Sequence, residues 1–242
     1  REGLVLIDPE TFMYKVNSWS ESNTLGPSHM RLNCIFIDSA QDIWIGTEAG
    51  LDKYDLVNNT FYHFKLSADA DASLSDVAVQ SIVSDKGDGL WLGTRNGLVH
   101  FNPKGNLNIR YLNDREDSTS LGGNDIWHLL VDSKERLWIA TDKGGLSLYN
   151  AQTDSFIQYK NKPGLESSLT SNVIRTIAED QNGDIWLGAY PAGIDFFDQS
   201  SVGILSYTND VQDEMSLSHN SVLAIDEDHR GNLWLGTDSG GL

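Results

Sequence analysis

Hydrophobic and polar residues alternate in short runs along the chain. Runs such as Phe61-Tyr62-His63-Phe64 and Phe156-Ile157-Gln158-Tyr159 have the length and aromatic content of half-buried β-strands. Turn residues separate these runs, as in Asp180-Gln181-Asn182-Gly183, where an aspartate can cap the turn and a glycine supplies positive φ. The period of two excludes a helical solenoid and predicts an all-β chain.

One strand sequence recurs at a fixed interval. LWLGT stands at residues 90–94, and its relatives occupy Ile43–Thr47, Leu137–Thr141, Ile185–Ala189 and Leu233–Thr237. Their tryptophans, Trp44, Trp91, Trp138, Trp186 and Trp234, are separated by 47, 47, 48 and 48 residues. A period of this size indicates a stacked or circular array of similar units.

Each repeat unit has the pattern of four strands. An apolar run ending in an aspartate six residues before the tryptophan predicts strand A, and the tryptophan segment predicts strand B. A glycine turn then leads to strand C, for example Gly145-Leu146-Ser147, and an aromatic alternation forms strand D. Four antiparallel strands with short turns are one blade of a β-propeller. The repeated tryptophan is predicted to fill the gap between neighbouring sheets.

The repeats predict the domain organisation. We expect a single β-propeller over residues 1–242, containing about five blades. The predicted boundaries are a half blade at 1–17, blades at 31–66, 78–114, 125–161 and 173–209, and a half blade at 221–242. Either the two half blades pair to close a five-bladed ring, or the chain is an excerpt of a ring with more blades.

The motif itself resembles a known repeat family. The segments DEDHRGNLWLGTDSGGL and VSDKGDGLWLGTRNGLVHFN are similar to the two-component regulator propeller repeat. Four of the links between repeats agree with each other. In each of them a Ser-Leu pair occurs, and its leucine stands eleven residues before the repeat aspartate. These are Ser73-Leu74-Ser75, Ser120-Leu121-Gly122, Ser168-Leu169-Thr170 and Ser216-Leu217-Ser218; the first link differs, with thirteen residues from Leu25 to Asp38.

The resemblance implies a function. Proteins of this family have seven-bladed propellers in the periplasmic sensor region of bacterial hybrid two-component histidine kinases, which recognise oligosaccharides and control polysaccharide-utilisation genes. It therefore implies an oligosaccharide ligand, a periplasmic location and neighbouring propeller or sensor domains of the same protein as partners. A homodimer is a further expectation.

Charge and cysteine content narrow the possible partners. The 35 acidic and 17 basic residues give a formal charge of −18, which repels nucleic acid. The single cysteine, Cys34, lies in an apolar run and is predicted to be a buried structural thiol. No stretch approaches the roughly 18 apolar residues of a membrane span, and the start REGLVLID has no signal-peptide pattern.

Candidate binding residues are those at which the copies differ, because the positions that repeat hold up the fold. Near the start of strand A, five residues before each aspartate, a variable residue follows a constant aliphatic one. The predicted B–C turns carry a second variable position. The first set is Asn33, Gln80, Trp127, Arg175 and Leu223, and the second is Glu48, Arg95, Asp142, Tyr190 and Asp238. Topology predicts that both sets lie on one face, around the mouth of the central channel.

The chemistry of these residues suits a sugar. Trp127 and Tyr190 offer flat apolar faces for a pyranose ring. Planar groups that hydrogen-bond to vicinal hydroxyls or to a carboxylate come from Arg175, Gln80, Asn33 and Arg95. The alternative is structural: Trp127 plugs the channel and the arginines are solvated charges. Trp19, outside the repeat, either extends this site or packs beneath its loop.

Catalytic and metal sites receive little support from the sequence. The six histidines show no i, i+4 pair, so no metal or cofactor is predicted. His128 has the chemistry of a general base, but no nucleophile signature accompanies it. Most aspartates occupy turn positions, and Glu179 and Asp226 are single departures. We expect a non-enzymatic ligand-sensing module, with an interaction scaffold and a glycan-cleaving enzyme as alternatives.

Overall fold

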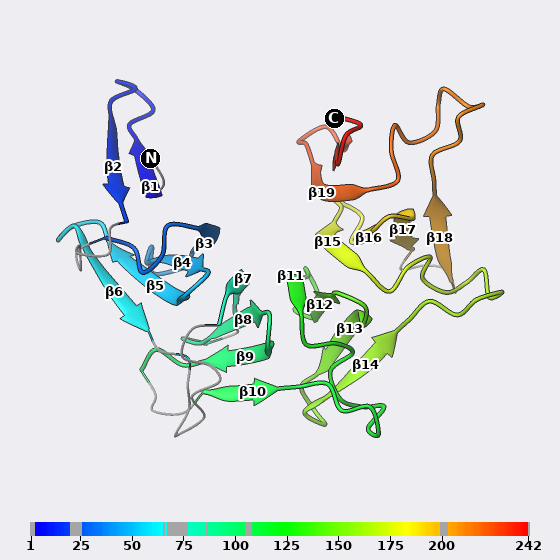
Figure 1. Ribbon diagram of the computed structural model, residues 1–242, viewed down its shortest axis with the longest axis horizontal. Coiled ribbons are helices and arrows are strands. Elements are labelled where there is room, and N and C mark those ends of the chain that lie inside the picture. Colours follow the sequence, from blue (N-terminus) through cyan, green and yellow to red (C-terminus); the bar gives the residue numbers. More distant parts are fainter. Residues whose placement is uncertain are drawn as a thin grey trace. The chain divides into compact units, whose positions relative to one another are not determined.

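The computed structural model describes residues 3–19, 26–64, 66, 77–85, 87–104, 108–198 and 203–241. Within these residues every regular element is a β-strand, and no helix is long and apolar enough to cross a membrane. The strands form four four-stranded and two two-stranded sheets (Figure 1). The all-β prediction is therefore confirmed. The motif Ser73-Leu74-Ser75 and Leu25 lie outside the described residues.

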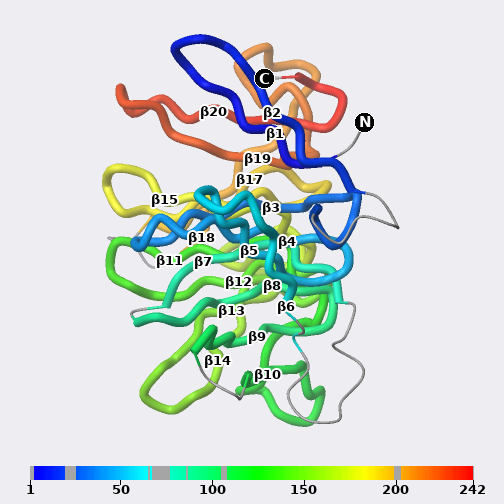
Figure 2. Tube along the Cα trace, turned by 90° about the vertical axis from the view of Figure 1, so that its left-hand side faces the viewer, coloured from blue at the N-terminus to red at the C-terminus, as the bar shows by residue number. Residues whose placement is uncertain are grey.

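The chain divides into two compact units, residues 1–110 and 111–242. Unit 1 begins with the hairpin β1–β2, blue in Figure 2, and continues with two sheets whose strands pair in chain order. Its strands are β1 (Gly3–Ile7), β2 (Tyr14–Ser18), β3 (Leu32–Ile37), β4 (Ile43–Thr47), β5 (Gly50–Asp55), β6 (Thr60–Phe64), β7 (Val79–Ser84), β8 (Leu90–Thr94), β9 (Gly97–Phe101) and β10 (Ile109–Tyr111), the last of which ends at the first residue of unit 2.

Unit 2 repeats the same design. Two four-stranded sheets are followed by the pair β19–β20, whose strands run side by side (Figure 2). Its strands are β11 (Ile126–Val131), β12 (Leu137–Thr141), β13 (Gly145–Asn150), β14 (Ser155–Tyr159), β15 (Ile174–Glu179), β16 (Ile185–Ala189), β17 (Gly193–Phe197), β18 (Ile204–Tyr207), β19 (Val222–Glu227) and β20 (Leu233–Thr237). Each sheet is antiparallel, which confirms the predicted order of strands A to D.

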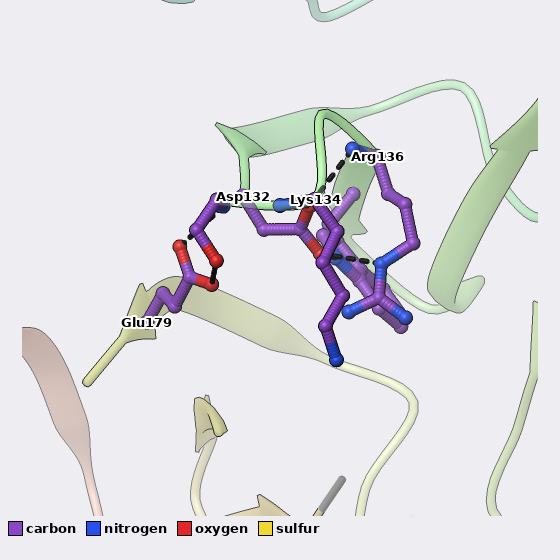
Figure 3. A network of polar contacts seen from close by, with 6 residues as sticks. Asp132, Lys134, Arg136 and Glu179 are labelled. Carbon is purple, nitrogen blue, oxygen red and sulfur yellow. Dashed lines mark hydrogen bonds and ion pairs between the residues drawn. The ribbon is translucent and has the colours of Figure 1, made fainter. Parts of the chain in front are cut away.

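The repeat aspartate organises the turn between strands A and B. In the third repeat, Asp132 Oδ1 accepts the backbone N–H groups of Lys134 and Arg136, at 3.0 and 2.8 Å (Figure 3). Its other oxygen, Oδ2, accepts the indole N–H of Trp138 at 2.8 Å. This bond explains the constant six-residue spacing of aspartate and tryptophan. The same indole bond joins Trp44 to Asp38, Trp186 to Asp180 and Trp234 to Asp228.

In the second repeat a histidine binds the turn aspartate. Asp85 Oδ2 lies 2.7 Å from Nε2 of His100 on β9. The imidazole of His100 stacks on Trp91, with ring centroids 4.2 Å apart. A histidine thus binds the turn aspartate here and packs against the repeat tryptophan.

Trp44 and Trp138 pack between neighbouring sheets, as the sequence predicts. Trp44 on β4 contacts Phe101 of the next sheet, with ring centroids 6.0 Å apart, and is 2% exposed. Trp138 on β12 contacts Phe197 in the same way at 6.1 Å and is 3% exposed. Trp234 lies on β20, in the last sheet of unit 2, and is 53% exposed.

Close approach of neighbouring sheets predicts the effect of a small substitution at Gly188. A Cβ atom there would lie 2.8 Å from the Val222 carbonyl oxygen of the next sheet, whereas one at Gly236, the same repeat position, meets only ordinary contacts at 3.5 Å. Gly188→Ala should lower the free energy of unfolding by about 1–3 kcal/mol, because overpacking displaces backbone. Gly236→Ala should change it by less than about 0.5 kcal/mol. Urea unfolding monitored by tryptophan fluorescence measures both; equal effects would contradict the packing argument.

Candidate functional site

A β-bulge interrupts the start of strand A in every described repeat. In β11 the register shifts between Ile126 and His128, and in β15 between Ile174 and Thr176. The bulge residues are Asn33, Gln80, Trp127, Arg175 and Leu223, the five variable positions of the sequence. A bulge residue is unpaired in the ladder and its side chain is re-aimed. This geometry explains why the position varies while the aliphatic residue before it does not.

The variable turn residues lie at the same end of each sheet as the bulges. The backbone N–H of Tyr190 donates to the carbonyl oxygen of Val173, two residues before Arg175, at 2.9 Å. The same bond recurs in the other sheets, from Glu48 to Arg31, Arg95 to Ala78, Asp142 to Asp125 and Asp238 to Ser221. Each sheet therefore presents one bulge residue and one turn residue together.

Three predicted site residues meet in unit 2. The guanidinium carbon of Arg175 lies 3.8 Å from the ring centroid of Trp127 on the neighbouring sheet. It lies 5.1 Å from the ring centroid of Tyr190, the turn residue of its own sheet. All three side chains are half-buried. We refer to them as the aromatic–arginine cluster; their cation–π contacts hold the guanidinium against a flat apolar surface.

Two polar atoms of the cluster lack hydrogen-bond partners. Arg175 Nε and Trp127 Nε1 are both buried, and neither has a partner among the described residues. Buried donors are nearly always satisfied in folded proteins, because an unsatisfied one costs about 1–3 kcal/mol. An unsatisfied pair at variable positions therefore points to an acceptor supplied from outside the chain.

The three predicted residues in unit 1 have different surroundings. Asn33 Nδ2 donates to the carbonyl oxygen of Val79 at 3.1 Å. Val79 directly precedes Gln80 in the chain. Gln80 Nε2 is buried without a partner among the described residues. Arg95 is exposed, and its Nη2 lies 3.4 Å from Glu48 Oε1. Assembly of all six residues into one site stays a prediction.

A polar cavity of about 440 Å³ lies in unit 2 at the link before β11, at a place the sequence analysis missed. Three glycines, Gly122, Gly123 and Gly144, stand close together at this point. Its lining also includes the variable turn residue Asp142 and the cations Arg115, Lys143 and Lys160. In the sequence, the feature that could have indicated this cavity is the two Gly-Gly pairs at 122–123 and 144–145.

His128 is a structural residue of unit 2. Its Nδ1 accepts the backbone N–H of Ile177 on the neighbouring sheet at 2.9 Å. Burial lowers the pKa of His128, which keeps the ring neutral and suited to this acceptor role. The bond leaves Nδ1 engaged, so the general-base role considered for this residue has no geometric support.

Glu179 ties two sheets of unit 2 together. Its carboxylate accepts the backbone N–H of Ser133 at 2.7 Å and the Ser133 hydroxyl at 2.5 Å (Figure 3). Glu227 receives the backbone N–H of Gln181 in the same manner at 2.7 Å. Glu179 and Glu227 stand at the same position of successive repeats, directly before the repeat aspartate, and both link neighbouring sheets.

Cys34 and the metal-ligating residue types offer no reactive site in the described part of the chain. Burial raises the pKa of the Cys34 thiol to about 12, so the group stays protonated at neutral pH. The described residues contain no group of three or more His, Cys, Asp or Glu side chains placed to hold a metal ion.

The sequence and the fold now identify the repeats. The family model described as two component regulator propeller matches residues 120–143, 168–190 and 216–239. These three segments are two component regulator propeller repeats. Each matched segment runs from the Ser-Leu link through strand A to the B–C turn, and so spans both the bulge and the variable turn residue. No curated protein matches the chain significantly.

Solved structures share the propeller fold of this regulator-repeat chain. The extracellular domain of a putative hybrid two component system from B. thetaiotaomicron has a TM-score of 0.81 and 22% identity, covering 100% of this chain and 30% of that one. The extracellular domain of a putative one component system from the same organism has a TM-score of 0.63 and 20% identity, covering 98% and 36%. This chain spans about a third of the length of these two proteins.

An enzyme has the same fold. Virginiamycin B lyase from Staphylococcus aureus has a TM-score of 0.60 and 12% identity, covering 88% of this chain and 65% of the lyase. At these identities the likeness shows the β-propeller fold alone. About five blades are present in the regulator-repeat chain.

Proposed function

We propose that this chain is the ligand-sensing propeller module of an extracytoplasmic two-component sensor, that it recognises an oligosaccharide, and that it signals to a histidine kinase. The observation that carries the proposal is the aromatic–arginine cluster of unit 2, which presents buried unpaired donors at positions that vary between repeats. The repeat family and the extracellular location of the similar structures support it. We propose that the module has no enzymatic activity. Its proposed partners are neighbouring sensor domains of the same protein.

A sugar matches the cluster physically. Trp127 supplies a flat apolar ring for the C–H face of a pyranose, and the donors of Arg175 hydrogen-bond to ring substituents. A sensor responds only if the ligand binds one of two arrangements better than the other. Because packed sheets resist gradual deformation, the response in this proposal is a rearrangement between domains or subunits.

Trp127→Ala tests the assignment. In a thermal-unfolding screen against neutral and acidic oligosaccharides, a glycan present at about 100 Kd should stabilise the wild-type chain by roughly 2.7 kcal/mol, which raises Tm by roughly 5–11 °C. Trp127→Ala should abolish this shift, because it removes the stacking surface and releases the Arg175 side chain. Trp234→Ala, at an exposed tryptophan of the same unit, should keep it. A shift of unchanged size in Trp127→Ala would contradict the proposed site.

A second candidate, an interaction or dimerisation scaffold, is favoured by exposed apolar side chains on the hairpin β1–β2. Phe12 is 77% exposed, Tyr14 72% and Ile7 62%. Patches of this kind mark association surfaces. Sedimentation over a range of protein concentrations tests the scaffold function: a dimer supports it, and a strict monomer at high concentration counts against it.

A further inference from the structure

Arg175 is a cation of an acidic protein, and it has no carboxylate partner in the part of the chain that the structure describes. The chain carries 35 acidic and 17 basic residues, and the cations Lys53 and Arg136 each lie against an aspartate. Arg95, at a turn in unit 1, lies 3.4 Å from Glu48. No carboxylate among the described residues lies within 4.0 Å of the Arg175 guanidinium nitrogens. Its contacts are with the two aromatic rings instead.

The unpaired atoms of the cluster are of one chemical kind. Arg175 Nε and Trp127 Nε1 carry hydrogens and can only donate. A sugar hydroxyl that accepts from them also brings a hydrogen that needs its own acceptor. A carboxylate brings acceptors alone, with about four lone-pair sites on two oxygens. The donor-only character therefore favours a carboxylate over a hydroxyl.

Stacking prepares the guanidinium for this ligand. A guanidinium against the indole of Trp127 keeps its plane fixed, so its edge nitrogens remain for two parallel N–H···O bonds. The apolar rings also reduce solvation around the charge, which strengthens a charge-assisted hydrogen bond. In the preceding sheet the turn position equivalent to Tyr190 is a carboxylate, Asp142, which already has Lys143 Nζ at 3.5 Å.

We infer that the ligand of this module is an acidic glycan whose uronate carboxylate binds Arg175, with its pyranose ring on Trp127. The inference rests on the proposed function and names its ligand class. The net charge of −18 makes this a local effect, in which the Arg175 guanidinium binds an anion that the rest of the surface repels.

Matched glycan pairs test the inference by titration calorimetry. The probes are oligogalacturonate with its methyl ester, and glucuronic-acid-substituted xylo-oligosaccharide with plain xylo-oligosaccharide. Members of each pair differ mainly in the carboxylate. We expect one acid to bind at least 10-fold more tightly than its neutral partner, since hydrogen bonds to charged groups contribute about 1.5–3 kcal/mol.

Variants at Arg175 locate the contact. Arg175→Met should reduce the affinity for the acid to that of its neutral partner. Arg175→Lys, which keeps the charge but loses the planar fork, should restore part of the preference. Arg230→Gln removes the same charge from the turn after β19, and should leave the preference unchanged. Thermal unfolding without ligand checks that each variant is folded. If Arg175→Met does not fold, Arg175→Lys replaces it in the test.

The outcomes separate the two proposals. Tight binding of neutral probes without a preference for acids leaves oligosaccharide sensing standing and overturns the acidic-ligand inference. Binding of an acid with the same affinity in wild type and Arg175→Met also overturns it. Binding of no probe to the wild-type chain overturns both proposals.

Discussion

Trp138→Ala should lower the free energy of unfolding by about 3–5 kcal/mol, the range for removing a fully buried tryptophan. The indole is 3% exposed and packs against Tyr159 of its own sheet and Phe197 of the next, with both ring centroids at 6.1 Å. Its loss opens a cavity between two sheets that their backbones cannot close. Urea unfolding at neutral pH, followed by far-UV circular dichroism, measures the change.

The repeat supplies a matched control for this prediction. Trp234 makes the same indole bond to its turn aspartate, at 3.0 Å, but is 53% exposed. Trp234→Ala should cost no more than about 1.5 kcal/mol, since it removes the hydrogen bond and little packing. Similar losses in both variants would show that the indole bond, rather than packing between sheets, carries the stability of the repeat.

Asp132→Asn should lower the free energy of unfolding by about 3 kcal/mol, because two hydrogen bonds to a buried carboxylate oxygen are lost. Oδ2 accepts from Trp138 Nε1 at 2.8 Å and from Arg136 Nε at 2.6 Å, and the side chain is fully buried. An amide NH₂ group at this position would face two donors. The Oδ1 bonds of the turn can remain, so the loss should fall short of unfolding the unit.

The same substitution should change the response to acid. Burial raises the pKa of Asp132, but the bonds from Trp138 and Arg136 outweigh it and hold the pKa below its ordinary value. A lowered pKa stabilises the fold fully above the unfolded value of about 4, and this contribution is lost as pH falls through the folded pKa. Asp132→Asn should therefore lose stability less steeply than wild type between about pH 4 and 2.

Asp228 provides the control for the acid response. Hydrogen bonds from Asn232 and Trp234 lower its pKa also, but the carboxylate stands at an exposed turn. Asp228→Asn should therefore cost less stability at neutral pH than Asp132→Asn. Urea midpoints of the three proteins, measured at several pH values from 2 to 7, compare them. Parallel pH profiles for wild type and Asp132→Asn would contradict the role of the buried carboxylate.

Sequence alone determined the repeat and its turns, because the contacts behind them are local. The aspartate and tryptophan of one repeat are six residues apart, and the turn between them is closed by bonds of two to four residues. Residues that make these contacts therefore recur at the same short spacing in each repeat, where the sequence shows them directly. Comparison of the copies also identified the variable positions, Trp127 and Arg175 among them.

Only the tertiary structure decided what those positions do. The bulge at Arg175 depends on the pairing register of β15 with β16, and no single residue type predicts that register. The contact of Arg175 with Trp127 joins two sheets across 48 residues of chain, as does the tether from Glu179 to Ser133 across 46. Trp127 and Arg175 stand at a position where every copy has a different residue, so their contact leaves no periodic signal in the sequence. The aromatic–arginine cluster is therefore a property of packing, whereas the blades that hold it are a property of the repeat.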